Sequence, residues 1–247
     1  MRDEAMDGVA GSAGIVTGAG RGIGEACATL LAARGARVML ADLDEGRLQE
    51  VAAGIQEAGG QVAIKVTDVR DWMSVEALAA ACVDRFGGID FAIANAGIGS
   101  YSSIHDGDPD AWRRVVETNL LGVMHTVRAT YPHMKDQRRG HIVLMASIAG
   151  RQTWVGEPIY IATKWGVVGF GWALRKEAMA HNVRVTMIEP GIVDTPLVRE
   201  SEEGRSELER FASLSTADVA NAVVFALSQP EGVAVSELML TPVGPEL

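Results

Sequence analysis

The sequence has few cysteines, few aromatic residues and few lysines. Its two cysteines, Cys27 and Cys82, are too few for a disulfide framework. Aromatic residues make up 5% of the 247 residues, with three tyrosines, and there are four lysines. No apolar run reaches the ~18 residues that suggest a membrane span, and the polar, acidic first residues lack the apolar core of a signal peptide. We therefore expect a soluble, cytoplasmic protein with reduced cysteines.

Basic residues are also in deficit. The chain has 22 Lys and Arg against 32 Asp and Glu, which gives a formal net charge of -10. Such a field repels phosphate backbones and argues against a nucleic-acid partner. A hydrophobic content of 48% excludes a disordered chain, and 28 glycines without a short period exclude a collagen-like one. A chain of this length can form one α/β domain with a full core.

Short apolar runs alternate with longer amphipathic stretches. The apolar runs predict strands at Gly14–Thr17, Ala36–Ala41, Gln61–Val66, Ile89–Ala94, His141–Ala146, Val183–Ile188 and Glu237–Thr241. The amphipathic stretches predict helices at Gly22–Arg34, Glu45–Ala58, Ser74–Phe86, Asp110–Gln137, Pro158–His181 and Thr216–Ser228. This alternation predicts a parallel sheet with helices on both faces. No linker divides the chain, so we expect one domain over residues 1–247, with a mobile, lid-like substrate segment at about residues 195–214.

A glycine-rich turn follows the first predicted strand, in Thr17-Gly18-Ala19-Gly20-Arg21-Gly22-Ile23-Gly24. Glycines let the backbone approach a ligand, and the helix that follows offers unpaired N–H groups and positive potential to a pyrophosphate. The spacing Gly18-x-x-x-Gly22-x-Gly24 departs from the G-x-G-x-x-G pattern, and no Gly-Lys-Ser/Thr follows as in a P-loop. The turn therefore predicts a dinucleotide site, with a simple tight turn as the alternative.

The second predicted strand ends at Asp42, which is followed by Leu43 and Asp44. An acidic side chain there can accept hydrogen bonds from both hydroxyls of an adenosine ribose, and it repels a 2′-phosphate. The alternative is a solvated turn aspartate. Arg21 could help to hold a 2′-phosphate, but no basic residue follows Asp42 closely. We therefore favour NAD as the cofactor.

Two Tyr-x-x-x-Lys pairs occur, Tyr131/Lys135 and Tyr160/Lys164. A lysine one helical turn after a tyrosine lies on the same face and can lower its pKa, which proton transfer requires because free tyrosine titrates near 10. The first pair adjoins Pro132 at the end of a helical stretch, which indicates an ordinary surface or packing tyrosine. The second begins a helix rich in small residues, which can let a cofactor approach.

Ser147 lies thirteen residues before Tyr160, just past an apolar strand. Ligands of open α/β sheets bind at the carboxyl ends of the strands, where this hydroxyl can donate to a substrate oxygen. Thr118 has the same spacing from Tyr131, but it lies inside a helical pattern. The alternative for Ser147 is a helix or turn cap.

These motifs, together with Asn95-Ala96-Gly97 and Pro190-Gly191, closely resemble the short-chain dehydrogenase/reductase family. Each motif is weak alone, but the combination is highly specific and spans nearly the whole chain. The resemblance implies an α/β, Rossmann-type doubly wound domain with a seven-stranded parallel sheet. It also implies hydride transfer between nicotinamide C4 and a carbinol carbon.

The resemblance implies four catalytic residues. Tyr160 would be the general acid/base, and Lys164 would lower its pKa and hold the nicotinamide ribose. Ser147 would bind and polarise the substrate oxygen. Asn119 matches the family's helix asparagine, whose carbonyl helps to hold a water for proton relay; a helix-bending polar core residue is the alternative.

The resemblance also implies an NAD site. Asp68 would bind the adenine amino group beside Val69, although a helix cap is the alternative for Asp68. Val193 and Thr195 would hold the carboxamide, and residues 95–97 would pack beside the adenosine ribose and brace the sheet. The complete expected set is Gly18, Arg21, Gly22, Ile23, Gly24, Asp42, Leu43, Asp68, Val69, Asn95, Ala96, Gly97, Tyr160, Lys164, Pro190, Gly191, Val193 and Thr195.

Two positions depart from the family pattern. Ala94 stands where many members have asparagine, which touches no catalytic group. The C-terminus does not end in the common Asp-Gly-Gly, which argues against a simple match to the acyl-carrier ketoreductases. The five histidines show no metal-ligand spacing, so we expect no metal.

We expect an NAD-dependent oxidoreductase that acts on a secondary alcohol or its ketone, as a homodimer or homotetramer. An NADPH-dependent carbonyl reductase is an alternative. A non-enzymatic dinucleotide-sensing regulator is another, but it would not need the tyrosine, lysine and serine set.

The substrate walls are expected at residues 99–103, 148–159 and 195–214. Within them an apolar pocket is predicted from Trp154, Val155, Ile159 and Leu197. A polar contact, or simply a solvated surface, is expected of Arg151 and Glu157. This pattern favours a medium-sized apolar alcohol.

Overall fold

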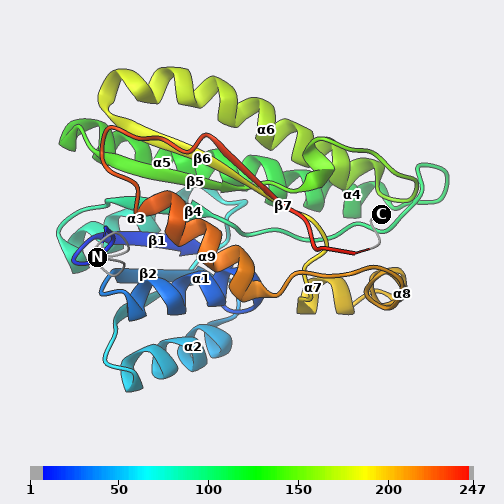
Figure 1. Ribbon diagram of the computed structural model, residues 1–247, viewed down its shortest axis with the longest axis horizontal. Helices are drawn as coiled ribbons and strands as arrows, with labels where there is room; N and C mark the ends of the chain where they lie inside the picture. The colour runs from blue at the N-terminus through cyan, green and yellow to red at the C-terminus, as the bar shows by residue number, and fades with distance from the viewer. Residues whose placement is uncertain (1–7, 245–247) are drawn as a thin grey trace.

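The apolar runs of the sequence form one parallel sheet. The computed structural model describes residues 8–244, and its seven strands lie in the order β3-β2-β1-β4-β5-β6-β7 (Figure 1). Their bounds are β1 Ala13–Thr17, β2 Arg37–Asp42, β3 Gln61–Val66, β4 Phe91–Ala94, β5 Gly140–Met145, β6 Val183–Pro190 and β7 Glu237–Leu240. Every pairing is parallel, so all carboxyl ends meet at one edge. The prediction of a doubly wound α/β fold is confirmed.

Helices cover both faces of the sheet (Figure 1). Their bounds are α1 Gly22–Ala33, α2 Glu45–Glu57, α3 Trp72–Phe86, α4 Pro109–Val116, α5 Gly122–Gln137, α6 Pro158–Ala178, α7 Pro196–Arg199, α8 Glu202–Arg210 and α9 Thr216–Leu227. One apolar core joins α3, α5 and α6 to the sheet, and a second joins α1, α2 and α9 to its other face. None of the helices between residues 8 and 244 is long and apolar enough to cross a membrane.

The predicted helix at Asp110–Gln137 is interrupted. A π-helical turn at Glu117–Leu121 separates α4 from α5. A π-turn adds one residue and rotates the apolar stripe that follows it by about 100°. A stretch that carries apolar residues on more than one face does not reveal such a rotation, so the periodicity gave one continuous helix.

The segment at residues 195–214 contains regular structure, which the sequence reading did not expect. The segment has poor apolar periodicity, which does not reveal its two short helices, α7 and α8. Side-chain caps stabilise the N-termini of both helices. Thr195 accepts a hydrogen bond from the Val198 backbone at 3.4 Å, and Ser201 accepts one from Gly204 at 2.9 Å. The segment follows β6 and lies at the carboxyl edge of the sheet (Figure 1).

His141 on β5 is buried in the sheet. Its Nε2 lies 2.7 Å from the Thr186 hydroxyl, which itself donates to the Val235 carbonyl, so Nε2 is the protonated nitrogen. Nδ1 has no hydrogen-bond partner among residues 8–244. Burial, and next the charge of Arg184, lower the pKa of His141 from 6.5 to about 3. The folded protein therefore holds this imidazole neutral.

This burial makes stability depend on pH. Between about pH 6.5 and pH 3 the unfolded chain protonates His141 and the folded chain does not, so the fold loses stability as the pH falls. We predict that His141→Gln removes this component, so the free energy of unfolding of the variant relative to wild type rises as the pH is lowered from 7 to 4. Urea titrations at several pH values measure it, and a difference that stays constant with pH would contradict it.

Candidate active site

A cavity of about 430 Å³ lies at the carboxyl edge of the sheet. It is bordered by both the glycine-rich turn and the predicted catalytic residues. All the expected site residues except Gly24 and Asn119 line it, namely Gly18, Arg21, Gly22, Ile23, Asp42, Leu43, Asp68, Val69, Asn95, Ala96, Gly97, Ser147, Tyr160, Lys164, Pro190, Gly191, Val193 and Thr195. Residues that are far apart in the sequence therefore meet at one cavity.

The glycine-rich turn forms one wall. Gly22 has a φ of +62°, a conformation that favours glycine. A Cβ atom at Gly24 would lie 2.0 Å from the Gly18 carbonyl oxygen, so Gly24 lets α1 pack against the turn instead of lining the cavity. The N-terminus of α1 has no side-chain cap, whereas Asp44 caps α2. Free N–H groups beside a cavity suit a pyrophosphate.

Asp42 is held toward this turn from the end of β2. Its carboxylate accepts hydrogen bonds from the Gly20 backbone at 3.0 Å and from the Asp44 backbone at 3.2 Å. Arg21 is directed elsewhere, since its guanidinium pairs with Glu200 just beyond α7. The Asp42 carboxylate is therefore fixed at the end of β2, whereas the guanidinium of Arg21, the cation of the turn, is already paired with Glu200.

Asp68 lies at the cavity after β3, but Arg70 engages its carboxylate. The two side chains are joined by hydrogen bonds of 2.6 to 3.1 Å, which hold the pKa of Asp68 below its usual range. The alternative reading of Asp68 as a helix cap is wrong, because Asp71 caps α3 by accepting from the Met73 backbone. Arg70 also lines the cavity, and the sequence reading missed it.

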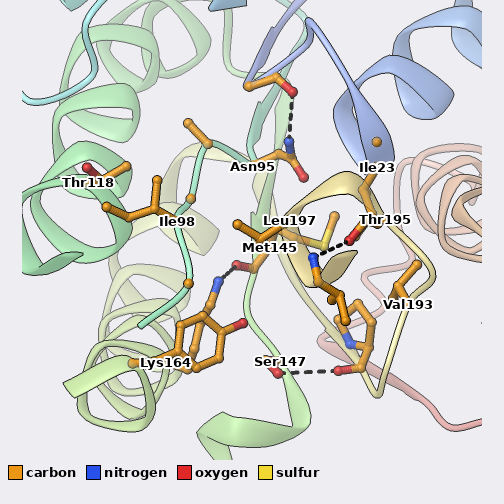
Figure 2. Close-up of a pocket in the computed structure, with 18 of the residues that line it drawn as sticks. Ile23, Asn95, Ile98, Thr118, Met145, Ser147, Lys164, Val193, Thr195 and Leu197 are labelled. Carbon is orange, nitrogen blue, oxygen red and sulfur yellow. Dashed lines mark hydrogen bonds between the residues drawn. The ribbon is translucent and has the colours of Figure 1, made fainter. Parts of the chain in front are cut away.

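Asn95, which lines the cavity after β4, is hydrogen-bonded to the end of β1. Its side-chain amide donates to the carbonyls of Thr17 and Gly18, and its backbone N–H donates to the Thr17 hydroxyl at 3.0 Å (Figure 2). The backbone of Ala96 donates to the same hydroxyl. The brace expected of residues 95–97 is therefore present.

Ser147, Tyr160 and Lys164 meet where β5 ends and α6 begins. Lys164 is buried and donates from Nζ to the Met145 carbonyl at 2.9 Å, with Nζ 5.5 Å from the centre of the Tyr160 ring (Figure 2). The Ser147 hydroxyl donates weakly to the Pro190 carbonyl at 3.4 Å and accepts from the Ala149 backbone. Ser147 thus caps a short turn, as its alternative reading held, and still faces the cavity.

The ionisation of this group differs from the expectation. Burial, and next the charge of Glu157, raise the pKa of Tyr160 to about 12, while the neighbouring Ser147 hydroxyl opposes the rise. Burial lowers the pKa of Lys164 to about 8. The expected lowering of the Tyr160 pKa is therefore not produced by the protein groups, because desolvation of the buried phenol raises it.

Asn119 lies away from the cavity lining. It sits in the π-helical turn, and its side chain is paired with the backbone of Ile98: the amide donates to the Ile98 carbonyl and accepts from its N–H, each at 2.8 Å. The side chain therefore positions the loop that follows β4. Ile98, which lines the cavity, is a site residue that the sequence reading missed.

The loop after β6 forms the wall next to the turn, with Thr195 close to Gly22. Gly191 donates to the Leu240 carbonyl at 2.7 Å, and Val193 forms a β-bridge with Leu214. Thr195 is buried and caps α7, so its hydroxyl both faces the cavity and fixes the helix that follows (Figure 2). These contacts hold three of the expected residues in place.

The comparisons agree with this geometry. The family model for short chain dehydrogenase matches residues 13–206. The chain belongs to the short-chain dehydrogenase family. It is 37% identical over 230 residues to an uncharacterized oxidoreductase from Staphylococcus saprophyticus. The aligned region covers 93% of this chain and 96% of that protein. It is therefore an oxidoreductase of the short-chain dehydrogenase type with a nicotinamide dinucleotide site.

Solved structures of the family have the same fold. An alcohol dehydrogenase from Thermococcus sibiricus, in complex with 5-hydroxy-NADP, has a TM-score of 0.85 at 31% identity, with 94% of this chain and 97% of that chain covered. Levodione reductase has a TM-score of 0.87 at 30% identity, with 94% and 96% covered. The sheet order and the flanking helices are thus those of short-chain dehydrogenases.

The substrate end of the cavity differs from the apolar pocket expected. Trp154 and Leu197 line it, but Val155 is 98% exposed, and Ile159 does not border the cavity. Arg151 is also absent from the lining, because its guanidinium pairs with Glu189 and Glu237 at the ends of neighbouring strands. Two of the four apolar residues expected there therefore line the cavity.

Polar side chains complete that end. Glu157 lines the cavity from the start of α6, Glu207 from α8 and Tyr101 from the loop after β4. Tyr101 and Glu207 lie within the expected walls at residues 99–103 and 195–214, but neither belongs to a motif that could have revealed its role. Across residues 8–244, no three His, Cys, Asp or Glu side chains gather where they could hold a metal ion.

The pairing of Asn119 with Ile98 predicts a structural role for this amide. We predict that Asn119→Ala lowers the free energy of unfolding by about 2 kcal/mol, because it removes two hydrogen bonds to a partly buried backbone. Thr118→Ala, on the same turn, is the control and is expected to cost less. Urea unfolding of both variants measures the difference, and equal losses would show that Asn119 does not anchor the loop.

Proposed function

We propose that this protein is an NAD-dependent oxidoreductase that interconverts a secondary alcohol and its ketone. The observation that carries the proposal is the meeting of Ser147, Tyr160 and Lys164 at the cavity that the uncapped N-terminus of α1 also borders. A dinucleotide site alone would serve a regulator equally well. Such a regulator would have no need of a phenol, an ammonium and a hydroxyl placed together at one end of that site.

The residues divide the work by position. When bound, the nicotinamide cofactor supplies the acceptor for a hydride. The Ser147 hydroxyl donates to the substrate oxygen and so orients the carbinol carbon. Tyr160 Oη takes the hydroxyl proton in the oxidative direction and returns it in the reductive one. The Lys164 ammonium, fixed by the Met145 carbonyl, lies on the same face of α6 and stabilises the phenolate.

The residues at the adenosine end support NAD. A carboxylate fixed by two backbone N–H groups at the end of β2 can accept hydrogen bonds from both ribose hydroxyls and would repel a 2′-phosphate. Leu43, which follows it, offers no charge. An NADPH-dependent carbonyl reductase is the second candidate, favoured by the NADP analogue named for the Thermococcus sibiricus structure and by Arg21 at the cavity.

The role of Tyr160 is tested by removing its hydroxyl. We predict that Tyr160→Phe binds NADH nearly normally and loses turnover by at least about 100-fold, because the proton has no acceptor. Fluorescence titration measures binding, and an assay of NADH formation over a panel of secondary alcohols measures turnover. Turnover retained in the variant would remove Tyr160 from the mechanism. Tyr131→Phe is the matched control and is expected to turn over like wild type, since its hydroxyl lies outside the cavity lining and donates to the Glu177 carbonyl at 3.4 Å.

The role of Asp42 is tested by cofactor choice. We predict that Asp42→Ala lowers the ratio of the NADPH dissociation constant to the NADH dissociation constant by about tenfold or more. The substitution removes both the acceptor for the ribose hydroxyls and the negative charge that repels a 2′-phosphate. Asp44→Ala is the control for loss of a neighbouring charge. An unchanged ratio in Asp42→Ala would remove this residue from the choice of cofactor, and a wild-type preference for NADPH would favour the second candidate.

A further inference from the structure

The substrate end of the cavity carries two carboxyl groups beside Tyr160. Glu157 is the residue before α6, and Glu207 lies on α8, which packs over that end. The charge of Glu157 acts on both Tyr160 and Tyr101, and the charge of Glu207 acts on Glu157. Two acids therefore face the same space from different elements.

Glu157 is buried without a cation. Its side chain belongs to a residue that is 7% exposed, and Oε2 accepts a hydrogen bond from Trp154 Nε1 at 2.7 Å. Oε1 accepts no hydrogen bond from any residue between 8 and 244, and the Glu157 residue lines the cavity. Burial first, and then the charge of Glu207, raise the pKa of Glu157 to about 7. A buried carboxylate of this kind is costly unless a positive group comes to it.

The surroundings supply no such group. From each element packed against Glu157, the facing groups are Trp154 on its own loop, Tyr160 on α6, Tyr101 after β4 and Glu207 on α8. Two cations lie nearby, and neither pairs with Glu157: the Lys164 ammonium contacts the Met145 carbonyl, and Arg114 on α4, which also lines the cavity, is more than half exposed and lies 3.9 Å from Asp108. Arg210 acts on Glu207 rather than on Glu157.

We propose that Glu157, supported by Glu207, binds a protonated amine of the substrate. The substrate would then be a secondary alcohol that carries an amino group, or the amino ketone that its oxidation yields. This inference rests on the proposed function. An ammonium that entered the cavity would satisfy Oε1 of Glu157 and offset the repulsion between the two carboxylates, which a neutral alkyl group of the same size cannot do. The net charge of -10 also attracts a cationic ligand.

Matched pairs of alcohols test the charge alone. 1-Amino-2-propanol and 2-butanol differ only by an ammonium in place of a methyl group, and longer pairs move the ammonium further from the carbinol carbon. We expect kcat/KM for the best amino alcohol to exceed that of its neutral partner by at least about tenfold at pH 8, which corresponds to ~1.4 kcal/mol. A hydroxy acid of similar length is expected to be the poorest substrate, because it brings a third carboxylate.

The ratio of the two kcat/KM values isolates Glu157. Changes in the Tyr160 pKa, including those that the charge of Glu157 causes, affect both substrates and cancel in the ratio, whereas the attraction of ionised Glu157 for an ammonium affects the amino alcohol alone. In wild type we expect the ratio to rise with pH through a midpoint near 7, where Glu157 loses its proton. Glu157→Gln keeps an acceptor for Trp154 and is expected to give a low ratio that does not change with pH. Glu207→Gln is expected to lower the ratio less.

Glu209→Gln is the control for net charge, because Glu209 is exposed on the same helix, α8. It is expected to keep the wild-type ratio. Neutral alcohols that are oxidised as efficiently as their amino partners, or a ratio in Glu157→Gln equal to that of wild type, would overturn the inference and leave the proposed function in place. Failure of wild type to oxidise or reduce any member of the panel, while binding NADH, would instead overturn the proposed function.

Discussion

The site depends on the tie between Thr17 and Asn95. The sheet order β3-β2-β1-β4 reverses direction at β1 and β4, and the chain leaves these two strands on opposite faces, which opens a crevice at their carboxyl ends. The Thr17 hydroxyl accepts from two backbone N–H groups after β4, and the Asn95 amide donates to two carbonyls after β1. These bonds fix the glycine-rich turn against the loop that carries Ile98. The same hydrogen bonds therefore position two walls of the cavity.

Burial has opposite consequences at the two ends of the cavity. At the nucleotide end, hydrogen bonds from Arg70 outweigh desolvation and lower the pKa of Asp68. At the substrate end, desolvation raises the pKa values of Tyr160 and Glu157 and lowers that of Lys164, so each group is displaced toward its neutral form. The chain thus supplies the positions of the reacting groups, while their ionisation depends on the charges that ligands bring to the cavity.

The sheet and most of the site could be predicted from the sequence, because both depend on local signals. Apolar runs located the strands, and the serine and tyrosine were placed by a strand end and a helix start. The π-helical turn could not be predicted, since one added residue leaves no mark in a stretch with several apolar faces. Arg70 was missed, and Glu207 was expected only as part of the wall at residues 195–214, because the positions of their partners Asp68 and Tyr101 are set by loop geometry. The preference for NAD, the cytoplasmic location and the homo-oligomer stay predictions.

The segment at residues 195–210 couples the two ends of the cavity. Thr195 borders the cavity and caps α7, Glu200 pairs with Arg21 of the glycine-rich turn, and Glu207 reaches Tyr101 at the substrate end. Because these contacts lie on one short stretch, a change in its position alters the wall at the nucleotide and the wall at the substrate together. Its many charges, which removed the apolar periodicity, are the side chains that make those contacts. The weakest signal in the sequence therefore marks the part of the cavity where the two ligand sites meet.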